Sequence, residues 1–417
     1  MSERKMIYLC LAHMSETGME LKYVKEAFET NWVVPMGPNV NGFEEDLASF
    51  VNSKVVCLSS GTAAVHLALV ACGVTAGDEV LVQSFTFCAS SHPITYLGAK
   101  PVFVDSERDT WNMDPELLEK AIIERKEVIG KYPKAIIPVA LYGMPYNCEK
   151  IMAIANKYGI PVIEDAAEGM GSRFNGQVLG TFGRFGVLSF NGNKMITTSG
   201  GGALICRNPE DANEIMWYGT QARDAYPYYE HTAIGYNYRM SNVCAGIGRG
   251  QMTVLDDHIA HHKHVQQLYS ELLGDVPGVT LHEQPADRRY DSNFWLCTAT
   301  LDPSVRIVGQ ENAYKETIKS AVGGAAGVIK AVDSAVTDCQ PNDNVEALRV
   351  FMLEKKVECR PVWKPMHKQP VYADAVAYVN GVSEEIFKVG FCLPAGPYVT
   401  DEDVKYIVEC IKEAIIE

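Results

Sequence analysis

Between residues 55 and 164 the chain alternates between short apolar runs and helical stretches, and this alternation limits the choice of fold more than any other feature. Strands are predicted for the apolar runs Val55–Leu58, Glu79–Gln83, Pro101–Val104, Ala135–Ala140 and Pro161–Glu164. Helical apolar spacing separates them at Thr62–Cys72, Pro115–Ile123 and Cys148–Tyr158. Runs that are apolar throughout are typical of strands buried on both faces, and the helices between them connect parallel strands. The pattern therefore predicts an α/β fold with a mostly parallel central sheet flanked by helices.

The pattern changes near residue 252. A long polar helix is predicted at Val254–Leu273, a segment rich in Ala and Gly follows at Ser320–Val336, and a last helix covers Asp401–Ile416. A chain of 417 residues is long enough for two domains. We therefore predict a large domain over residues 1–254 and a smaller α+β domain over residues 255–417.

Charge and cysteine usage indicate a soluble protein of the cytoplasm. The formal net charge of -15 argues against nonspecific binding to nucleic acid or to an anionic membrane surface. The 12 cysteines are scattered without a CxxC pair, as expected for reduced thiols. The apolar run Met6–Ala12 is too short for a signal peptide core or a membrane span, and we expect it to form a short opening strand.

The first candidate for chemistry is the turn Ser59–Thr62, which joins a predicted strand to a predicted helix. The first amides of a helix have no partner within the helix and lie at the positive end of its dipole, so they bind phosphate well. Ser60, Gly61 and Thr62 are therefore candidate phosphate ligands. A helix cap without a ligand is the alternative.

Asp165 and Lys194 are the other two candidates. Asp165 ends a buried strand, where a carboxylate can keep a pyridinium N–H charged; a capping aspartate is the alternative. Lys194 follows in the stretch SFNGNKMITTSGGG, and a lysine amine can bind an aldehyde covalently. The alternative for Lys194 is a solvated surface side chain. A phosphate site, an acid and a lysine, in this order on a parallel sheet, predict a pyridoxal phosphate site.

One helix carries a histidine cluster at His258, His261, His262 and His264. The spacing of four residues is also that of a helical metal-binding pair. We interpret the cluster as a solvated helix face, and we expect no metal because the predicted cofactor needs none.

Long ordered segments of the chain resemble the DegT/DnrJ/EryC1/StrS sugar aminotransferases, which have the fold-type I aspartate aminotransferase architecture. The resemblance runs from about Met6 to the C-terminus and is weakest between about Asp302 and Leu348. The segments that carry it are HMSETGMELKYVKEAF, SSGTAAVHLALVACGV, QSFTFCASSHPITYLGAKPVFVD, IPVIEDAAEGMGSRFNGQVLGTFGRFGVLSFNGNK, GYNYRMSN and RPVWKPMH.

The resemblance implies a role for individual residues. Lys194 would bind the cofactor's aldehyde, Asp165 would pair with the ring nitrogen, and Phe87 would stack on the ring face. Ser189 would hold the phosphate together with Gly61 and Thr62. Asn242 matches the residue that family members send into the neighbouring subunit's phosphate site, which implies a homodimer with shared active sites. Glu168 stands near the expected position of the ring's phenolic oxygen, where many members carry Gln or His.

The tetrapeptide NGNK, together with the segments YEHTAIGYNYRMSN and RPVWKPMH, resembles the sequences of one branch of this family. Enzymes of this branch act on UDP-4-keto-6-deoxy-N-acetylglucosamine, in the route to bacillosamine. The resemblance implies that glutamate supplies an amino group to C4 of this sugar, for bacterial glycan or glycoprotein synthesis. The alternatives are another nucleotide-linked 3- or 4-ketosugar as substrate, or a non-catalytic sugar-binding relative. Candidate contacts to the UDP group are Arg239, Arg360, Trp363, Lys364 and His367.

Overall fold

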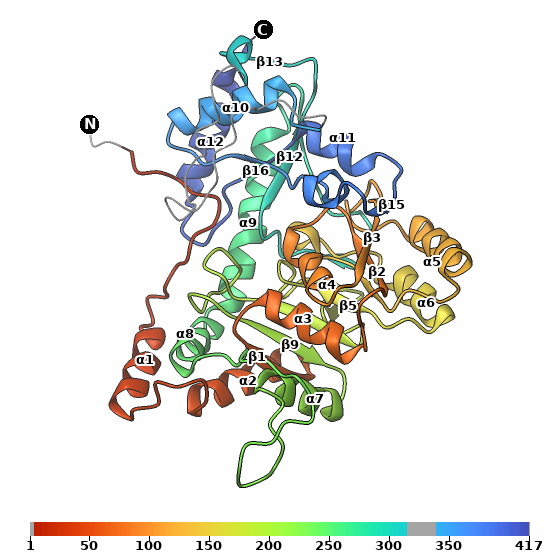
Figure 1. Ribbon diagram of the computed structural model, residues 1–417. Coiled ribbons are helices and arrows are strands. Elements are labelled where there is room, and N and C mark those ends of the chain that lie inside the picture. The colour runs from red at the N-terminus through yellow and green to blue at the C-terminus, as the bar shows by residue number, and fades with distance from the viewer. Residues whose placement is uncertain (1–3, 315–338, 417) are drawn as a thin grey trace.

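The computed structural model describes residues 4–314 and 339–416 and is built around one large sheet (Figure 1). Four parallel strands form one half in the order β15-β3-β2-β4: Val376–Tyr378, Lys100–Val104, Glu79–Gln83 and Ala135–Ile137. The other half has the order β1-β9-β8-β5: Lys54–Leu58, Gly202–Cys206, Phe185–Ser189 and Ile163–Asp165. Parallel bridges from Ile136 to Val162 and from Val139 to Asp165 join the halves. Only β9 runs antiparallel to its neighbours, so the predicted mostly parallel sheet is confirmed.

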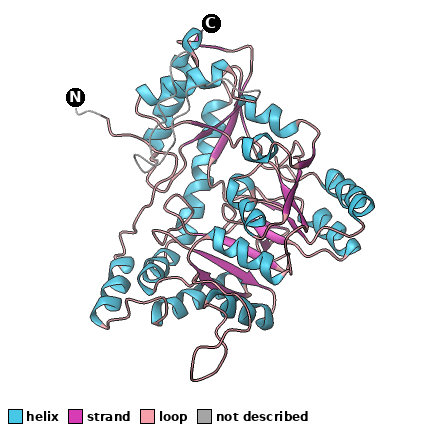
Figure 2. Ribbon diagram, viewed as in Figure 1, coloured by secondary structure: helices cyan, strands magenta, loops and turns pink. Residues whose placement is uncertain are grey.

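Both faces of this sheet are buried, which explains the continuous apolar runs. Along β2, Leu81 packs into one hydrophobic cluster, whereas Val80 and Val82 pack into another. Successive side chains of a strand point to opposite faces, so the two clusters lie on opposite sides of the sheet. Helices cover the sheet in Figure 2: α2 (Pro38–Val51), α3 (Gly61–Ala71), α4 (His92–Tyr96), α5 (Pro115–Ile129), α6 (Cys148–Tyr158) and α7 (Pro209–Gly219).

A second unit is built on an antiparallel sheet with a hydrophobic cluster of its own. Its strands, in the order β10-β12-β16-β14, are Val279–Leu281, Cys297–Leu301, Gly390–Leu393 and Arg360–Pro361. Its helices are α9 (Leu255–Leu273), α10 (Asp343–Glu354) and α12 (Asp401–Ala414). This is the α+β composition predicted for the C-terminal part. The predicted segment Ser320–Val336 lies outside the described residues.

Two segments cross the predicted boundary at residue 255. Strand β15, from the C-terminal part, extends the large sheet beside β3. In the other direction, Ile7 forms a single bridge with Val357 and packs in the core of the smaller unit. The expected strand at Met6–Ala12 is therefore wrong, because only Ile7 makes a ladder contact there. The division into residues 1–254 and 255–417 stays a prediction.

The interpretation of the histidine cluster on α9 as a solvated face is wrong for three of its four members. His258 and His262 are buried, and their Nδ1 atoms lie 3.1 and 3.2 Å from the carbonyl oxygens of Met195 and Phe294. Burial lowers the pKa of His262 to about 3, so the ring is neutral. His261 bonds to the carbonyl of Gly396, and only His264 stays half exposed, beside Asp401.

The face of α9 that carries His258, His261 and His262 therefore packs against backbone carbonyl groups. One of these carbonyls belongs to Met195, the residue that follows Lys194. No group of His, Cys, Asp and Glu suited to a metal ion occurs within residues 4–314 and 339–416. In the same part of the chain, no helix combines the length and the apolar character needed to cross a membrane.

Candidate active site

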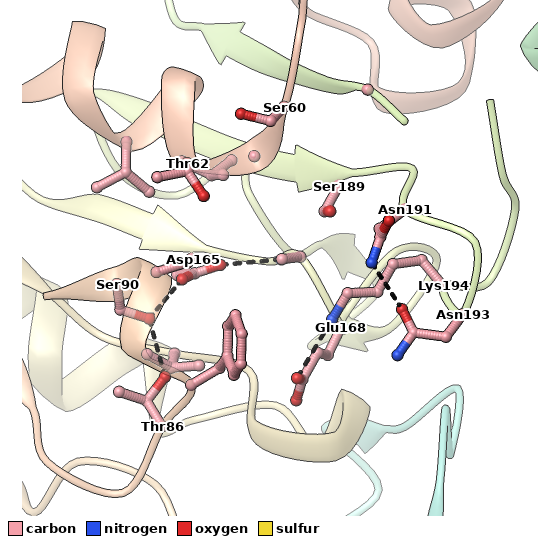
Figure 3. Close-up of a pocket in the computed structure, with 18 of the residues that line it drawn as sticks. Ser60, Thr62, Thr86, Ser90, Asp165, Glu168, Ser189, Asn191, Asn193 and Lys194 are labelled. Atoms are coloured by element: carbon pink, nitrogen blue, oxygen red, sulfur yellow. Dashed lines mark hydrogen bonds and ion pairs between the residues drawn. The ribbon is translucent and has the colours of Figure 1, made fainter. Parts of the chain in front are cut away.

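Nine of the predicted site residues line a single cavity beyond the carboxyl ends of β1, β5 and β8. Open α/β sheets place their ligand sites at this edge. These nine are Ser60, Gly61, Thr62, Phe87, Asp165, Glu168, Ser189, Lys194 and Trp363. Figure 3 shows their polar side chains around the same space, with Asp165 and Lys194 reaching it from separate segments.

The turn before α3 has the form of a phosphate cradle. The Ser60 hydroxyl caps the helix and accepts a hydrogen bond from the Ala63 amide at 3.0 Å, so the cap that was the alternative to a phosphate site is present. The helix starts at Gly61, where an added Cβ would lie 3.1 Å from the Cβ of Ser189. A Cβ on Gly202 would lie 2.4 Å from the carbonyl carbon of Ser60, which explains the small residue there. The start of α3 and Ser189 therefore meet at the cavity, as a bound phosphate requires.

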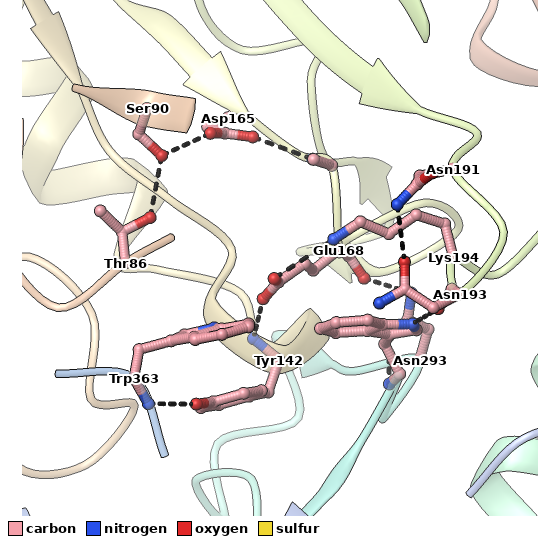
Figure 4. A network of polar contacts seen from close by, with 12 residues as sticks. Thr86, Ser90, Tyr142, Asp165, Glu168, Asn191, Asn193, Lys194, Asn293 and Trp363 are labelled. Carbon is pink, nitrogen blue, oxygen red and sulfur yellow. Dashed lines mark hydrogen bonds and ion pairs between the residues drawn. The ribbon is translucent and has the colours of Figure 1, made fainter. Parts of the chain in front are cut away.

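Asp165 is a buried carboxylate held in place by hydroxyl groups. Its Oδ2 accepts a hydrogen bond of 2.6 Å from the Ser90 hydroxyl, which lies 2.8 Å from the Thr86 hydroxyl. Its Oδ1 accepts a longer bond, 3.2 Å, from the Ala167 amide. Figure 4 shows this chain of three side chains on the cavity wall opposite Glu168. Sequence reasoning missed Thr86 and Ser90, although both lie in the segment that follows strand β2.

Lys194 is not a solvated lysine, because its side chain is only 13% exposed. Its Nζ lies 3.3 Å from Oε1 of Glu168 and 4.1 Å from the ring centroid of Trp295. The other oxygen of Glu168 accepts a hydrogen bond from the Tyr142 amide at 2.7 Å. Burial raises the pKa of Glu168 above its ordinary value, while the ammonium group and the amide oppose this rise.

Aromatic rings form one side of the cavity. Tyr142 lies between Trp295 and Trp363, nearly parallel to both, with centroid distances of 6.4 and 6.2 Å. The Tyr142 hydroxyl accepts a hydrogen bond from the Trp363 amide at 2.8 Å, and burial raises the pKa of Tyr142, so it stays a neutral phenol. Phe87 is half exposed, 5.2 Å from Trp363. The sequence motifs contained Phe87 and Trp363, but Tyr142 and Trp295 stand outside any of them.

The cationic residues predicted to bind the UDP group do not line the cavity. The Arg239 side chain is only 9% exposed and forms an ion pair with Glu44, so its contact with the UDP group stays a prediction. Both ring nitrogens of His367 are engaged, with the Ser84 hydroxyl and with Glu384. Arg360 is half exposed and pairs with Glu358. Lys364, one residue after Trp363, is partly buried.

Asn242 is held within its own chain, and its contact with a neighbouring subunit stays a prediction. Its side chain is buried, and its Oδ1 accepts hydrogen bonds from the amides of Asn39 and Val40 at 2.9 and 3.2 Å. Its Nδ2 donates to the carbonyl of Trp32 at 2.9 Å. The side chain therefore fixes the start of α2 in its own chain, and reaching a neighbouring subunit would break all three bonds.

Asn293 supports the site from behind. Its Nδ2 donates to the carbonyls of Glu168 and Met170, both at 2.9 Å, and its Oδ1 accepts from the Trp295 amide at 2.9 Å. Gly143 allows this arrangement, because an added Cβ would lie 1.9 Å from Oδ1 of Asn293. Asn293 therefore connects the backbones that carry Glu168 and Trp295.

Replacing Gly143 with alanine is expected to destabilise the protein and to lower its activity. The residue has φ +91°, and the added methyl group would displace Asn293, so we expect a loss of about 3 kcal/mol in the free energy of unfolding. Gly159→Ala is the matched control, since its φ is +65° with no atom within 4 Å of an added Cβ, and it should lose only about 1 kcal/mol. Denaturant titration compares the two, and equal losses would show that Asn293 is not displaced.

These residues fit pyridoxal phosphate. A helix start and a serine are available for the phosphate, a buried carboxylate for the ring nitrogen, and a lysine for the aldehyde. Together with the parallel sheet, they define the class of pyridoxal phosphate-dependent enzymes.

Comparison with known proteins identifies the family. The model of the DegT/DnrJ/EryC1/StrS aminotransferase family matches residues 15–329 and 314–412, and the chain belongs to this family. EpsN of Bacillus subtilis, whose name places it among pyridoxal phosphate-dependent aminotransferases, is 41% identical over 98% of this chain and 95% of its own. A GDP-perosamine synthase of Escherichia coli O157:H7 is 31% identical over 98% and 99% of the two chains.

A UDP-2-acetamido-2-deoxy-3-oxo-D-glucuronate aminotransferase of Pseudomonas aeruginosa is 38% identical over 58% of this chain and 65% of its own. Among solved structures, a DegT DnrJ EryC1 StrS aminotransferase from Brucella abortus superimposes with a TM-score of 0.81, at 25% identity over 95% of both chains. The fold-type I prediction is thereby confirmed. The protein is a nucleotide-sugar aminotransferase that uses pyridoxal phosphate.

Proposed function

We propose that the enzyme transfers the amino group of glutamate to C4 of a UDP-4-keto-6-deoxy-N-acetylhexosamine, giving a UDP-4-amino sugar for bacterial glycan or glycoprotein synthesis. The observation that carries the catalytic part is the convergence of Lys194, Asp165 and the start of α3 on one cavity. The substrate rests on NGNK and RPVWKPMH, which resemble the branch acting on this sugar. One relative named for a UDP-2-acetamido sugar supports the nucleotide, although its name specifies a 3-oxo group.

When bound, the cofactor supplies an aldehyde that takes up the amino group and a ring that accepts the electron pair released at carbon. Lys194 would hold the aldehyde and, when detached from it, would move the proton that the amino transfer requires. Asp165 would keep the ring nitrogen protonated, and Ser90 holds that carboxylate in position. Gly61, Thr62 and Ser189 would hold the phosphate, and Phe87 would contact the ring.

We assign the UDP group to the mouth of the cavity, beside Trp363. This ring lines the cavity and is only partly buried, so one face is available to stack on uracil. Arg360 and Lys364 flank it in the chain and are the remaining candidates for the diphosphate. Arg360 is 47% exposed and can reach a ligand by giving up its pair with Glu358.

Arg360→Ala is expected to raise KM for the sugar nucleotide about 10- to 100-fold, because a charge-assisted hydrogen bond contributes about 1.5–3 kcal/mol. The KM for glutamate should not change. Arg108→Ala is the control, since Arg108 is 66% exposed and pairs with Glu385 away from the cavity lining. Steady-state kinetics with each substrate varied decides the point, and equal losses for both substrates would exclude the diphosphate contact.

We also propose a homodimer. Large apolar side chains are exposed on two segments: Phe28, Trp32, Val33, Val34 and Met36 on one, and Tyr226, Tyr228, Tyr229 and Ile234 on the other. Figure 1 shows the second segment, between α7 and α8 (Asn242–Met252), as a loop that extends from the body of the protein. Exposed apolar patches of this kind are typical of protein interfaces, and the resemblance described in the sequence analysis implies a second copy as partner. Light scattering should give a dimer, and Ile234→Asp with Val33→Asp should give a monomer.

Two experiments test the function. The purified protein should show yellow absorbance that borohydride removes, with the cofactor then attached to Lys194 in a peptide map. A protein that stays colourless after addition of pyridoxal phosphate would exclude the catalytic proposal.

A panel of UDP- and GDP-linked 3- and 4-ketosugars with glutamate then tests the substrate, with the product configuration determined by NMR. Turnover of a GDP-linked sugar alone would exclude the UDP assignment. Because the 12 cysteines are scattered without a CxxC pair, as expected for reduced thiols, we also propose a cytoplasmic location.

A further inference from the structure

The amino group of Lys194 is held between two groups that come from distant parts of the chain. Glu168, which follows β5 of the large sheet, places Oε1 at 3.3 Å from Nζ. Trp295, which precedes β12 of the second unit, places its ring centroid at 4.1 Å from the same atom. We call these two groups, the Glu168 carboxylate and the Trp295 ring, the ammonium site. Figure 4 shows the amino group of Lys194 beside the Glu168 carboxylate.

The position of the Trp295 ring is fixed on both sides. Its Nε1 donates a hydrogen bond of 2.6 Å to the carbonyl of Asn193, the residue before Lys194. Its backbone amide donates to Asn293, whose side chain also holds the carbonyl of Glu168. Both walls of the ammonium site are therefore set by one asparagine, and the ring is only 1% exposed.

Such a site suits an ammonium group that has no covalent partner. A cation over an indole face is attracted by the ring quadrupole, and the attraction grows when water is excluded. The carboxylate supplies the opposite charge from the other side. A transaminating lysine spends part of each cycle detached from the cofactor, so it needs a defined position from which to transfer a proton.

We propose that Glu168 and Trp295 receive the amino group of Lys194 whenever it is detached, and that Trp295 is a positioning residue for proton transfer by this lysine. The inference rests on the catalytic role proposed for Lys194. It adds to the active site a second residue that lies next to a strand of the second unit, because Trp295 belongs to neither the phosphate cradle nor the expected ring contacts. An ordinary core tryptophan, important only for packing, is the competing interpretation.

The first test uses the protein without cofactor. Trp295→Phe and Trp295→Met both lose the bond to Asn193 and fill similar space, but only phenylalanine keeps an aromatic face. Reductive methylation of Lys194, followed by peptide mapping, should be roughly 10-fold faster in Trp295→Met than in Trp295→Phe, because the ammonium group loses its partner. Equal rates in the two variants would overturn the proposal. Trp111→Met, at a buried tryptophan stacked on His282, should methylate like the wild type.

The second test uses the enzyme with cofactor and glutamate in single turnovers. Trp295→Met should be roughly 10-fold slower than Trp295→Phe in the loss of yellow absorbance. Glu168→Gln combined with Trp295→Met should lose less than the product of the two single losses, because both residues act on one amino group. Independent, multiplying losses would contradict a shared site.

Failure of this inference can be told from failure of the proposed function. If borohydride fixes the cofactor on Lys194 in the wild type while the Trp295 variants behave alike, only the ammonium site is excluded. If no cofactor attaches to Lys194 in the wild type, the catalytic proposal itself fails. Thermal unfolding of all variants shows whether a slower reaction reflects loss of packing. A packing defect alone would lower the stability of Trp295→Met and Trp111→Met equally. It would also leave the single-turnover rates of Trp295→Met and Trp295→Phe equal.

Discussion

Replacing Lys194 with alanine is expected to abolish transamination and to leave the fold intact. The variant loses both the amine that holds the cofactor's aldehyde and the base that moves the proton, so turnover should fall on the order of 10⁴-fold or more. The fold should survive because Lys194 lies in a turn after β8, outside the hydrophobic clusters. Glu168 keeps its bond from the Tyr142 amide, and its raised pKa lets it take up a proton once the ammonium group is gone.

The measurement combines activity, absorbance and thermal unfolding. The Lys194→Ala protein should lose the borohydride-sensitive attachment of the cofactor and should unfold within a few degrees of the wild type. A small primary amine added to the assay should restore part of the proton transfer, because the cavity left by the side chain opens beside Glu168 and Trp295. Near-normal turnover of the purified variant without added amine would contradict the role given to this lysine.

The large sheet could be predicted because burial on both faces is visible in the sequence of each strand as a continuous apolar run. Val80, Leu81 and Val82 alternate between two hydrophobic clusters, so the middle of β2 has to be apolar on both faces. The fold's long-range additions could not be predicted in the same way. Strand β15 is short and partly exposed at the sheet edge, so its sequence does not show that it pairs with β3. Ile7 makes only one β-bridge, but the apolar residues around it have the same pattern as a full strand, so the sequence does not distinguish the two.

In the candidate site, too, local features could be predicted and long-range contacts could not. Residues at or just after the carboxyl end of a strand, such as Asp165 and Ser60, could be predicted because a parallel sheet collects these ends at one edge. Residues that depend on a distant partner could not. Arg239 is an example, because the sequence does not show that its side chain forms an ion pair with Glu44, a residue far away along the chain. Trp295 reaches Lys194 only because two units pack together, and the histidines of α9 are buried for the same reason.

Asp165→Asn is the second variant with a large expected effect, and it separates charge from shape. Asparagine keeps one oxygen for the Ser90 hydroxyl and fits the same buried position, so the fold and the hydroxyl chain should persist. The negative charge that holds the ring nitrogen protonated is lost. Removing one partner of a buried ion pair costs about 3–5 kcal/mol, which corresponds to a fall in turnover of about 10²–10⁴-fold.

The cofactor should still bind to Asp165→Asn, because Lys194 and the phosphate cradle at Gly61 and Ser189 are unchanged. Yellow absorbance with slow single turnovers is therefore the expected result, and loss of cofactor would instead assign Asp165 to binding. Ser90→Ala is the matched control, since it removes the hydrogen bond to the carboxylate and keeps its charge. Loss of this one bond should cost about 1.5–3 kcal/mol, a decrease of about 10- to 100-fold, so Ser90→Ala should fall between the wild type and Asp165→Asn. A larger defect in Ser90→Ala than in Asp165→Asn would mean that orientation, and not charge, is what the carboxylate contributes.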